Sequence, residues 1–137
     1  MLQRNSREGL MYLESQAHPF GFVDSEGKPV PLDVGAIAFR HVLAKPEVKR
    51  LNIDVRLLVT GIRFAPDAEE HVASVYEFVD HHRDLWVGVN LAGGENSGKG
   101  QPLRFLKTFR KLRRQCAGIH LSIHGGDHRP RWNAAHA

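Results

Sequence analysis

Near its carboxyl end the sequence places a histidine and a carboxylate directly after a short apolar run. Positions 121–127 read LSIHGGD, so that His124 is followed by two glycines and then by Asp127. A β-strand that becomes polar at its carboxyl end, with glycines that let a ligand approach the backbone, is where α/β enzymes place their chemistry. The neutral imidazole of His124 can bind zinc, and the alternative is a histidine that only hydrogen-bonds a neighbouring loop.

A second glycine-rich turn lies one unit earlier, at residues 93–100, and reads GGENSGKG. This segment nearly matches a phosphate-binding P-loop, whose backbone amides cradle phosphates. Position 100 holds glycine where a P-loop has the hydroxyl that holds magnesium, and Pro102 places the helix start beyond Lys99. These departures favour the competing interpretation, a flexible basic loop on the surface.

Apolar periodicity predicts alternating strands and helices that would position both segments. Four stretches are expected to be strands, at residues 10–16, 53–62, 85–91 and 119–123. The segments between them are long enough for helical crossovers, which implies a parallel βαβαβαβ sheet covered by helices and an α/β fold class. Glu14, Gln16 and Arg63 end the first two strands, where such side chains could line a pocket.

Three helices are expected as crossovers. Asp33 can cap the first, proline and acidic residues at 66–70 mark the start of the second, and Pro102 begins the third. The predicted buried faces consist of Val34, Ile37, Ala38 and Val42 in the first helix, Ala68, Val72, Val75 and Val79 in the second, and Phe105, Phe109, Leu112 and Cys116 in the third.

Composition narrows the class of protein. The 137 residues are 42% hydrophobic and 25% charged, which is typical of one globular domain spanning 1–137. No apolar run approaches the ~20 residues of a membrane helix, so no membrane partner is expected. A single cysteine, Cys116, excludes an internal disulfide and fits a reducing compartment. We therefore expect a cytoplasmic protein.

The positive charge is concentrated in one predicted helix. The formal net charge is +4 and the pI is about 9.6, which permits nucleic-acid binding without requiring it. Much of the excess lies within residues 104–114. Because few aromatic residues are interleaved there as stacking platforms, a solvated helix face is favoured over a nucleic-acid interface.

The two glycine-rich strand ends together carry a family resemblance. The sequence WVGVNLAGGE at 86–95, a helix and then LSIHGGD at 121–127 resemble the middle of the adenosine deaminase family, which typically has Gly-[Ile/Phe]-Asp-Leu-Ala-Gly-x-Glu and His-Ala-Gly-Glu there. MYLESQ at 11–16 and GIRF at 61–64 resemble the preceding units. The resemblance covers roughly residues 9–127, leaves 128–137 as a divergent tail, and implies part of a zinc-dependent (β/α)₈ TIM barrel.

The resemblance also implies a reaction and a role for each candidate residue. Members hydrolyse the exocyclic amine of adenosine or a related aminopurine. By this likeness His124 would bind zinc, the backbone of Gly93 would meet the purine ring, and Asp127 would take the proton-donor position. Zinc would lower the pKa of bound water towards ~7, and the hydroxide would attack the ring carbon that carries the amine.

Several positions depart from the family pattern. Asp127 replaces glutamate, Gly125 replaces alanine and Asn90 replaces aspartate, and no His-x-His pair occurs, although the family takes two zinc ligands from one. A complete barrel usually needs about 250 residues. We therefore expect an internal piece of such a barrel, with little or no deaminase activity alone, whose bare sheet edges invite self-association or pairing with a missing barrel half.

The alternative function is of a different class. It is a non-catalytic phosphate- or nucleic-acid-binding α/β domain that uses the glycine-rich loop 93–100 and the basic helix 104–114.

Overall fold

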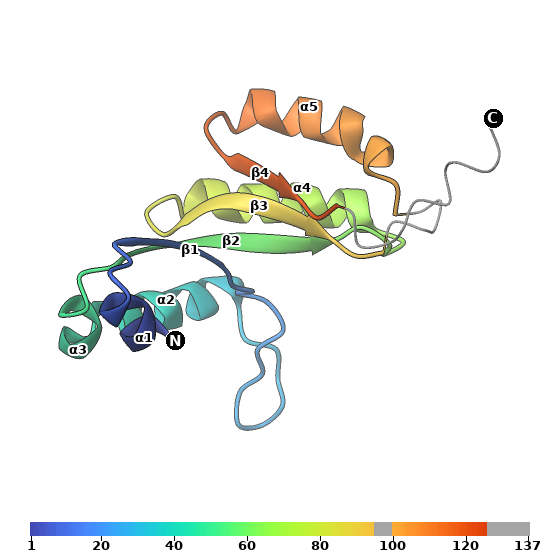
Figure 1. Cartoon of the computed structure of the whole chain (residues 1–137). Helices are drawn as coiled ribbons and strands as arrows, with labels where there is room; N and C mark the ends of the chain where they lie inside the picture. The colour runs from blue at the N-terminus through green and yellow to red at the C-terminus, as the bar shows by residue number, and fades with distance from the viewer. Residues whose placement is uncertain (95–99, 126–137) are drawn as a thin grey trace. The chain divides into compact units, whose positions relative to one another are not determined.

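The computed structural model of the chain describes residues 1–94 and 100–125 (Figure 1). The strands β1 (Tyr12–Gln16), β2 (Asp54–Ile62), β3 (Trp86–Ala92) and β4 (His120–Ile123) form one sheet in the order β1-β2-β3-β4. The outer pairs are parallel, with Tyr12 opposite Asp54 and Gly88 opposite His120. Strands alternate with helices, so the predicted α/β fold with a parallel sheet is confirmed, while its place in a (β/α)₈ barrel stays a prediction.

The chain divides into two compact units. The first consists of residues 1–59 and 82–87, and the second of residues 60–81 and 88–137. Strands β2 and β3 therefore run from the first unit into the second. The carboxyl ends of β2, β3 and β4, which carry the predicted site, all belong to the second unit.

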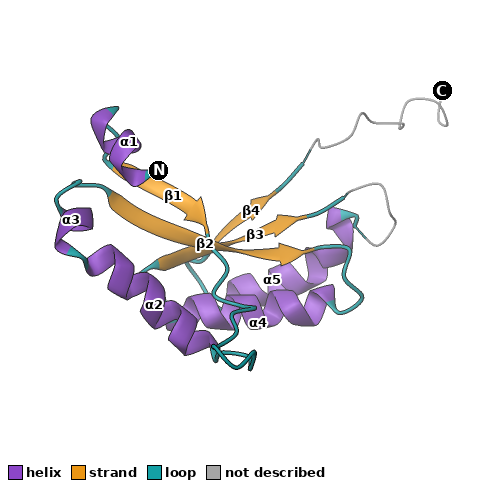
Figure 2. Cartoon of the chain, turned by 90° about the horizontal axis from the view of Figure 1, so that it is seen from below, coloured by secondary structure: helices purple, strands orange, loops and turns teal. Residues whose placement is uncertain are grey.

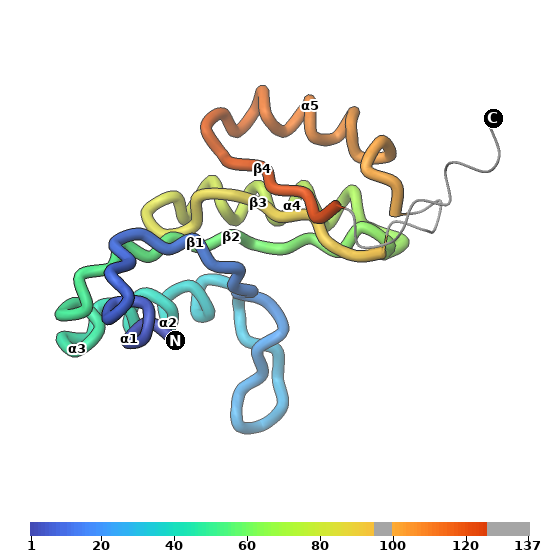
Figure 3. The backbone as a smooth tube through the Cα atoms, viewed as in Figure 1, coloured from blue at the N-terminus to red at the C-terminus, as the bar shows by residue number. Residues whose placement is uncertain are grey.

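The first unit holds three helices, α1 (Leu2–Arg7), α2 (Leu32–Ala44) and α3 (Pro46–Lys49). A long loop over residues 17–31 connects β1 to α2 (Figure 3), and a single antiparallel bridge joins Val23 to Pro29 within it. Asp33 does not cap α2 as predicted: the N-cap residue is Pro31, with no side-chain cap. Asp33 lies in the first turn instead, where the helix dipole favours a carboxylate.

The predicted buried face of α2 is also wrong. Val34, Ile37, Ala38 and Val42 are exposed, and the buried residues of this helix are Gly35 and Ala36. The physical reason is close approach to the loop, since a Cβ placed on Gly35 would lie only 2.6 Å from the carbonyl oxygen of Pro19. The fully buried positions of the helix are therefore its smallest residues, while Phe39 is half-buried with its ring 5.7 Å from that of Trp86.

The second unit holds α4 (Ala68–His81), the 3₁₀ turn η1 (Pro102–Phe105) and α5 (Leu106–Gln115). Both helices run along one face of β3 and β4 (Figure 2). Their predicted apolar stripes are confirmed, except that Cys116 is only half-buried. The rings of Tyr76 and Phe109, 6.2 Å apart, join the two helices. No helix in the described part of the chain has the length and apolar character needed to cross a bilayer.

Candidate functional site at the carboxyl ends of the strands

The ends of β2, β3 and β4 bring two predicted site residues together. The amide of His124 donates a hydrogen bond of 2.9 Å to the carbonyl of Leu91, two residues before Gly93. The amide of Arg63, the first residue after β2, donates a bond of 2.9 Å to the carbonyl of Ala92. Arg63, Gly93 and His124 therefore lie at one edge of the sheet, and with Phe64 we call them the strand-end cluster.

Arg63 is the anchor of this cluster. The residue has no exposed surface, and its Nη2 atom donates a hydrogen bond to the backbone carbonyl of His124. A charged guanidinium is costly to bury unless hydrogen bonds compensate for the water it loses. The side chain thus ties the end of β2 to the end of β4. The sequence shows Arg63 only as a polar residue at a strand end, without indicating which strand it would reach.

Gly93 has no side chain and so leaves room for the side chains of Arg63 and Phe64. Its φ of +119° lies in a region that residues with side chains rarely adopt. A Cβ at this position would lie 2.7 Å from Cδ1 of Phe64 and 3.4 Å from Cγ of Arg63. The ring and the aliphatic stem therefore occupy the volume that a side chain at residue 93 would fill.

The described residues do not fit a zinc site on their own. His124 is exposed at the end of β4, where an imidazole is accessible to a metal. A catalytic zinc needs about three protein ligands. Within residues 1–94 and 100–125, no group of three or more histidine, cysteine, aspartate or glutamate side chains could hold a metal ion. Asp127, the predicted proton donor, lies outside the described residues, as do residues 95–99 of the predicted phosphate loop.

A buried polar pair belongs to the same unit. The side-chain amide of Asn90 in β3 donates a hydrogen bond of 3.3 Å to the hydroxyl of Thr60 in β2, and both residues are buried. Among the described residues, nothing donates to Oδ1 of Asn90. A neutral amide is less costly to bury at this position than a carboxylate would be. Thr60 was not predicted as a site residue, although a polar residue within an apolar strand is a recognisable signal.

Glu14 and Gln16 belong to the first unit and are exposed on β1. Glu14 accepts a hydrogen bond of 2.6 Å from the hydroxyl of Tyr12, and this bond is the main cause that raises the pKa of Tyr12.

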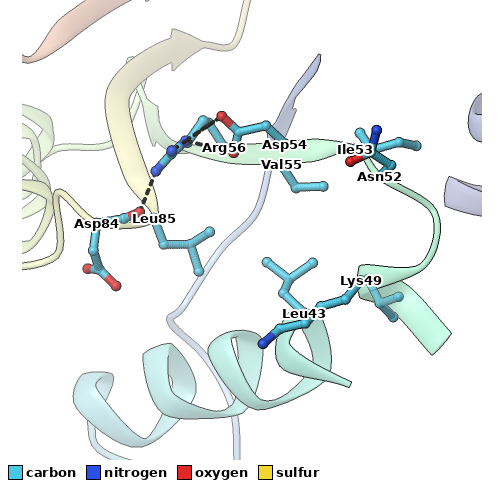
Figure 4. Close-up of a pocket in the computed structure, with 10 residues that line it drawn as sticks. Leu43, Lys49, Asn52, Ile53, Asp54, Val55, Arg56, Asp84 and Leu85 are labelled. Atoms are coloured by element: carbon cyan, nitrogen blue, oxygen red, sulfur yellow. Dashed lines mark hydrogen bonds and ion pairs between the residues drawn. The ribbon is translucent and has the colours of Figure 1, made fainter. Parts of the chain in front are cut away.

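The first unit also contains a cavity of about 420 Å³ around the amino end of β2 (Figure 4). The guanidinium of Arg56 donates to the carboxylate of Asp54, at 3.2 Å, and to the carbonyl of Asp84. The charges of Arg56 and Asp54 at this cavity therefore pair with each other. In parallel α/β folds the amino ends of the strands usually serve stability, and the carboxyl ends carry the chemistry.

Neither a scan against protein-family models nor a search of curated proteins finds a match to this sequence.

Proposed function

We propose that this chain is part of an adenosine deaminase-like hydrolase and supplies four consecutive strands of its (β/α)₈ barrel. The family reaction is zinc-dependent: water adds to the purine carbon that carries the amine, and ammonia leaves, so that adenosine becomes inosine. One observation carries the proposal: the backbone bond from His124 to Leu91 holds the candidate metal ligand beside Gly93, the candidate purine contact. The buried Arg63 supports it by fixing the carbonyl of His124.

Gly93, Arg63 and His124 of the strand-end cluster, together with Asp127, have a part in this proposal. The backbone of Gly93 would meet a flat purine ring at the end of β3, beside the ring of Phe64 that fills the side-chain position of residue 93. Arg63 keeps the backbone of His124 in register with that bend. Asp127 would donate a proton to a ring nitrogen, as a carboxyl acid near the substrate can do. Since the described residues provide only one of the metal donors, we expect the chain to bind the purine without turning it over.

Binding of a purine nucleoside tests the family assignment. Amide signals of the isotope-labelled chain would be followed by NMR during titration with adenosine, inosine and, as a pyrimidine control, uridine. Adenosine and inosine are expected to shift the amides of Gly93, Gly94 and His124, and uridine is expected to leave them in place. If adenosine moves none of these amides at millimolar concentration, the proposal fails.

Turnover tests the separate expectation that the chain is inactive alone. Inosine formation would be measured with and without added Zn²⁺ for the unchanged chain, for His124→Ala, and for His120→Ala as a matched control on the same strand, since both histidines are exposed. We expect no turnover in any of them. Zinc-dependent turnover that survives His120→Ala and disappears in His124→Ala would contradict the expected inactivity while supporting the family.

The alternative function, binding of phosphate or nucleic acid by loop 93–100 and helix 104–114, also stays a prediction. Five residues of that loop lie outside the described ranges. The structure describes the helix, and its exposed face favours a partner other than nucleic acid.

A further inference from the structure

One face of α5 carries positive charge that no described residue neutralises. Residues 102–115 contain six basic residues and no acidic one. Lys107, Arg110, Lys111 and Arg114 are exposed and stand three or four positions apart, so they share one side of the helix. We call these four residues the α5 basic face. In the described part of the chain, none of the four forms a hydrogen bond or an ion pair.

This arrangement disfavours the isolated helix. Like charges at these spacings repel one another, and no carboxylate lies between them. Lys107 is in the first turn, where the partial positive charge of the helix dipole opposes a cation. An anionic partner would relieve both effects.

Arg104 differs from these four residues. Its Nε and Nη2 atoms donate to the two carboxylate oxygens of Glu69 in α4, at 2.8 and 3.1 Å. This pair fixes the amino end of the segment to α4 and lowers the pKa of Glu69. Arg104 is thus paired with α4, whereas no carboxylate among residues 1–94 and 100–125 pairs with the α5 basic face.

Two leucines lie next to the α5 basic face. Leu103 is 77% exposed and Leu106 is 42% exposed. Together with the four cations they line a shallow hollow of about 680 Å³ on the outer side of η1 and α5. An apolar side chain of a partner could be covered there while carboxylates meet the lysines and arginines.

The chemistry of this hollow identifies the kind of partner. The aromatic residues of the segment, Phe105 and Phe109, are buried in the core and offer no surface on which a base could stack. Phosphates would use the cations and leave the leucines unused. We propose that the outer face of η1 and α5 is a docking surface for an acidic peptide segment of a partner protein, with apolar anchors that cover Leu103 and Leu106. The surface uses no residue of the strand-end cluster.

Fluorescence anisotropy tests this proposal with three labelled probes. The first is a Glu-rich peptide of about 15 residues with two leucines, which is long enough to span the ~15 Å length of α5. The second is the same peptide with both leucines replaced by serine, and the third is a short DNA duplex. We expect the leucine peptide to bind most tightly, and the serine peptide to bind about tenfold more weakly, because each leucine loses its apolar contact.

Charge reversal shows whether binding uses this face. Lys107→Glu with Lys111→Glu should weaken binding of the leucine peptide at least about tenfold, and added salt should do the same. Lys107→Ala with Lys111→Ala should weaken it less and keep the helix, since alanine has the highest helix propensity. The control pair Lys45→Glu with Arg50→Glu makes the same change of net charge at exposed residues around α3 and should leave affinity unchanged.

Four outcomes would overturn the proposal. They are tighter binding of the duplex than of the leucine peptide, equal binding of the two peptides, equal weakening by the control pair, and no binding of either peptide. Circular dichroism of each variant would confirm that the helix is intact.

Discussion

Two arginines anchor different units of this chain in different ways. In the first unit, Arg40 of α2 donates two hydrogen bonds to the carboxylate of Asp84, at 2.6 and 2.7 Å, and a third to Nδ1 of His82. The Nε2 atom of His82 lies 3.1 Å from a carboxylate oxygen of Asp33. In the second unit, Arg63 has no exposed surface and donates to a backbone carbonyl at the end of β4.

Each arginine holds two segments of the chain together, and we call such a side chain a brace. The brace formed by Arg40 faces solvent, and the brace formed by Arg63 is buried. Arg40 is 33% exposed and Asp84 is 59% exposed, so water and salt screen their attraction. The bonds of Arg40 depend on a carboxylate and therefore on pH. The stabilising effect of Arg63 includes the volume its stem fills and a hydrogen bond to a backbone carbonyl, which does not titrate. A buried brace of this kind holds strand ends in register while His124 stays exposed.

The largest effect is expected from shortening Arg63. Arg63→Ala removes a buried stem and the donor to the His124 carbonyl, and should lower the free energy of unfolding by about 2–4 kcal/mol. Arg63→Met keeps most of the packing and should cost about 1 kcal/mol. Urea denaturation measures both values. In each variant the amide of His124 should exchange with solvent faster than in the unchanged chain.

Arg40→Ala provides the comparison for that result. It removes an exposed ion pair and should cost about 1 kcal/mol. If Arg40→Ala and Arg63→Ala destabilise the protein equally, the distinction between the two braces is wrong.

A smaller effect is expected from adding a single methyl group at Gly93. Gly93→Ala should destabilise the protein by about 1–2 kcal/mol, because φ is +119° and because the new Cβ would press on Phe64. Gly94→Ala is the matched control, since nothing lies within 4 Å of a Cβ there, and it should change stability by less than about 0.5 kcal/mol.

A double variant separates the two causes at Gly93. Phe64 is 52% exposed, so its ring can be removed without opening the core. Adding Phe64→Ala to Gly93→Ala should recover the part that comes from the clash and leave the part that comes from the backbone angle. No recovery at all would show that the ring simply moves aside.

The sequence predicted the placement of His124 beside Gly93, because the ends of neighbouring parallel strands must meet at one edge of a sheet. It could not predict the link from Arg63 to His124, since that link depends on a long side chain passing the vacant position at Gly93. Which strand a flexible arginine reaches is decided by packing. The local pattern around residue 63 does not contain that information.

The buried faces of the helices show the same limit of prediction from a local pattern. In α5 the cations mark the outer face, so the buried positions Phe105, Phe109 and Leu112 follow from the pattern. In α2 apolar residues lie on most sides of the helix, and the face predicted from their spacing is exposed. Close approach of the loop to Gly35 decides the packing there, and that contact is long-range.

The smallest effect is expected from pH, and it concerns the solvent-facing pair of Arg40 and Asp84. The hydrogen bonds from Arg40 are the main cause that lowers the pKa of Asp84 in the folded protein. A carboxyl whose pKa is lower in the folded state stabilises the protein above its unfolded pKa, about 3.9, and this contribution is lost as pH falls through the folded pKa. Because Asp84 is 59% exposed, the contribution should be at most about 1 kcal/mol.

The variant Asp84→Asn measures the contribution of the Asp84 carboxylate to the free energy of unfolding. The difference in free energy of unfolding between the unchanged chain and Asp84→Asn should be largest near neutral pH and shrink steadily below about pH 4. In a background that also carries Arg40→Met, the same comparison should depend less on pH, because the donor that lowers the pKa is gone. If the pH dependence persists undiminished in that background, a group other than Arg40 stabilises the Asp84 carboxylate. The bonds of Arg40 would then not explain how the first unit differs from the strand-end cluster.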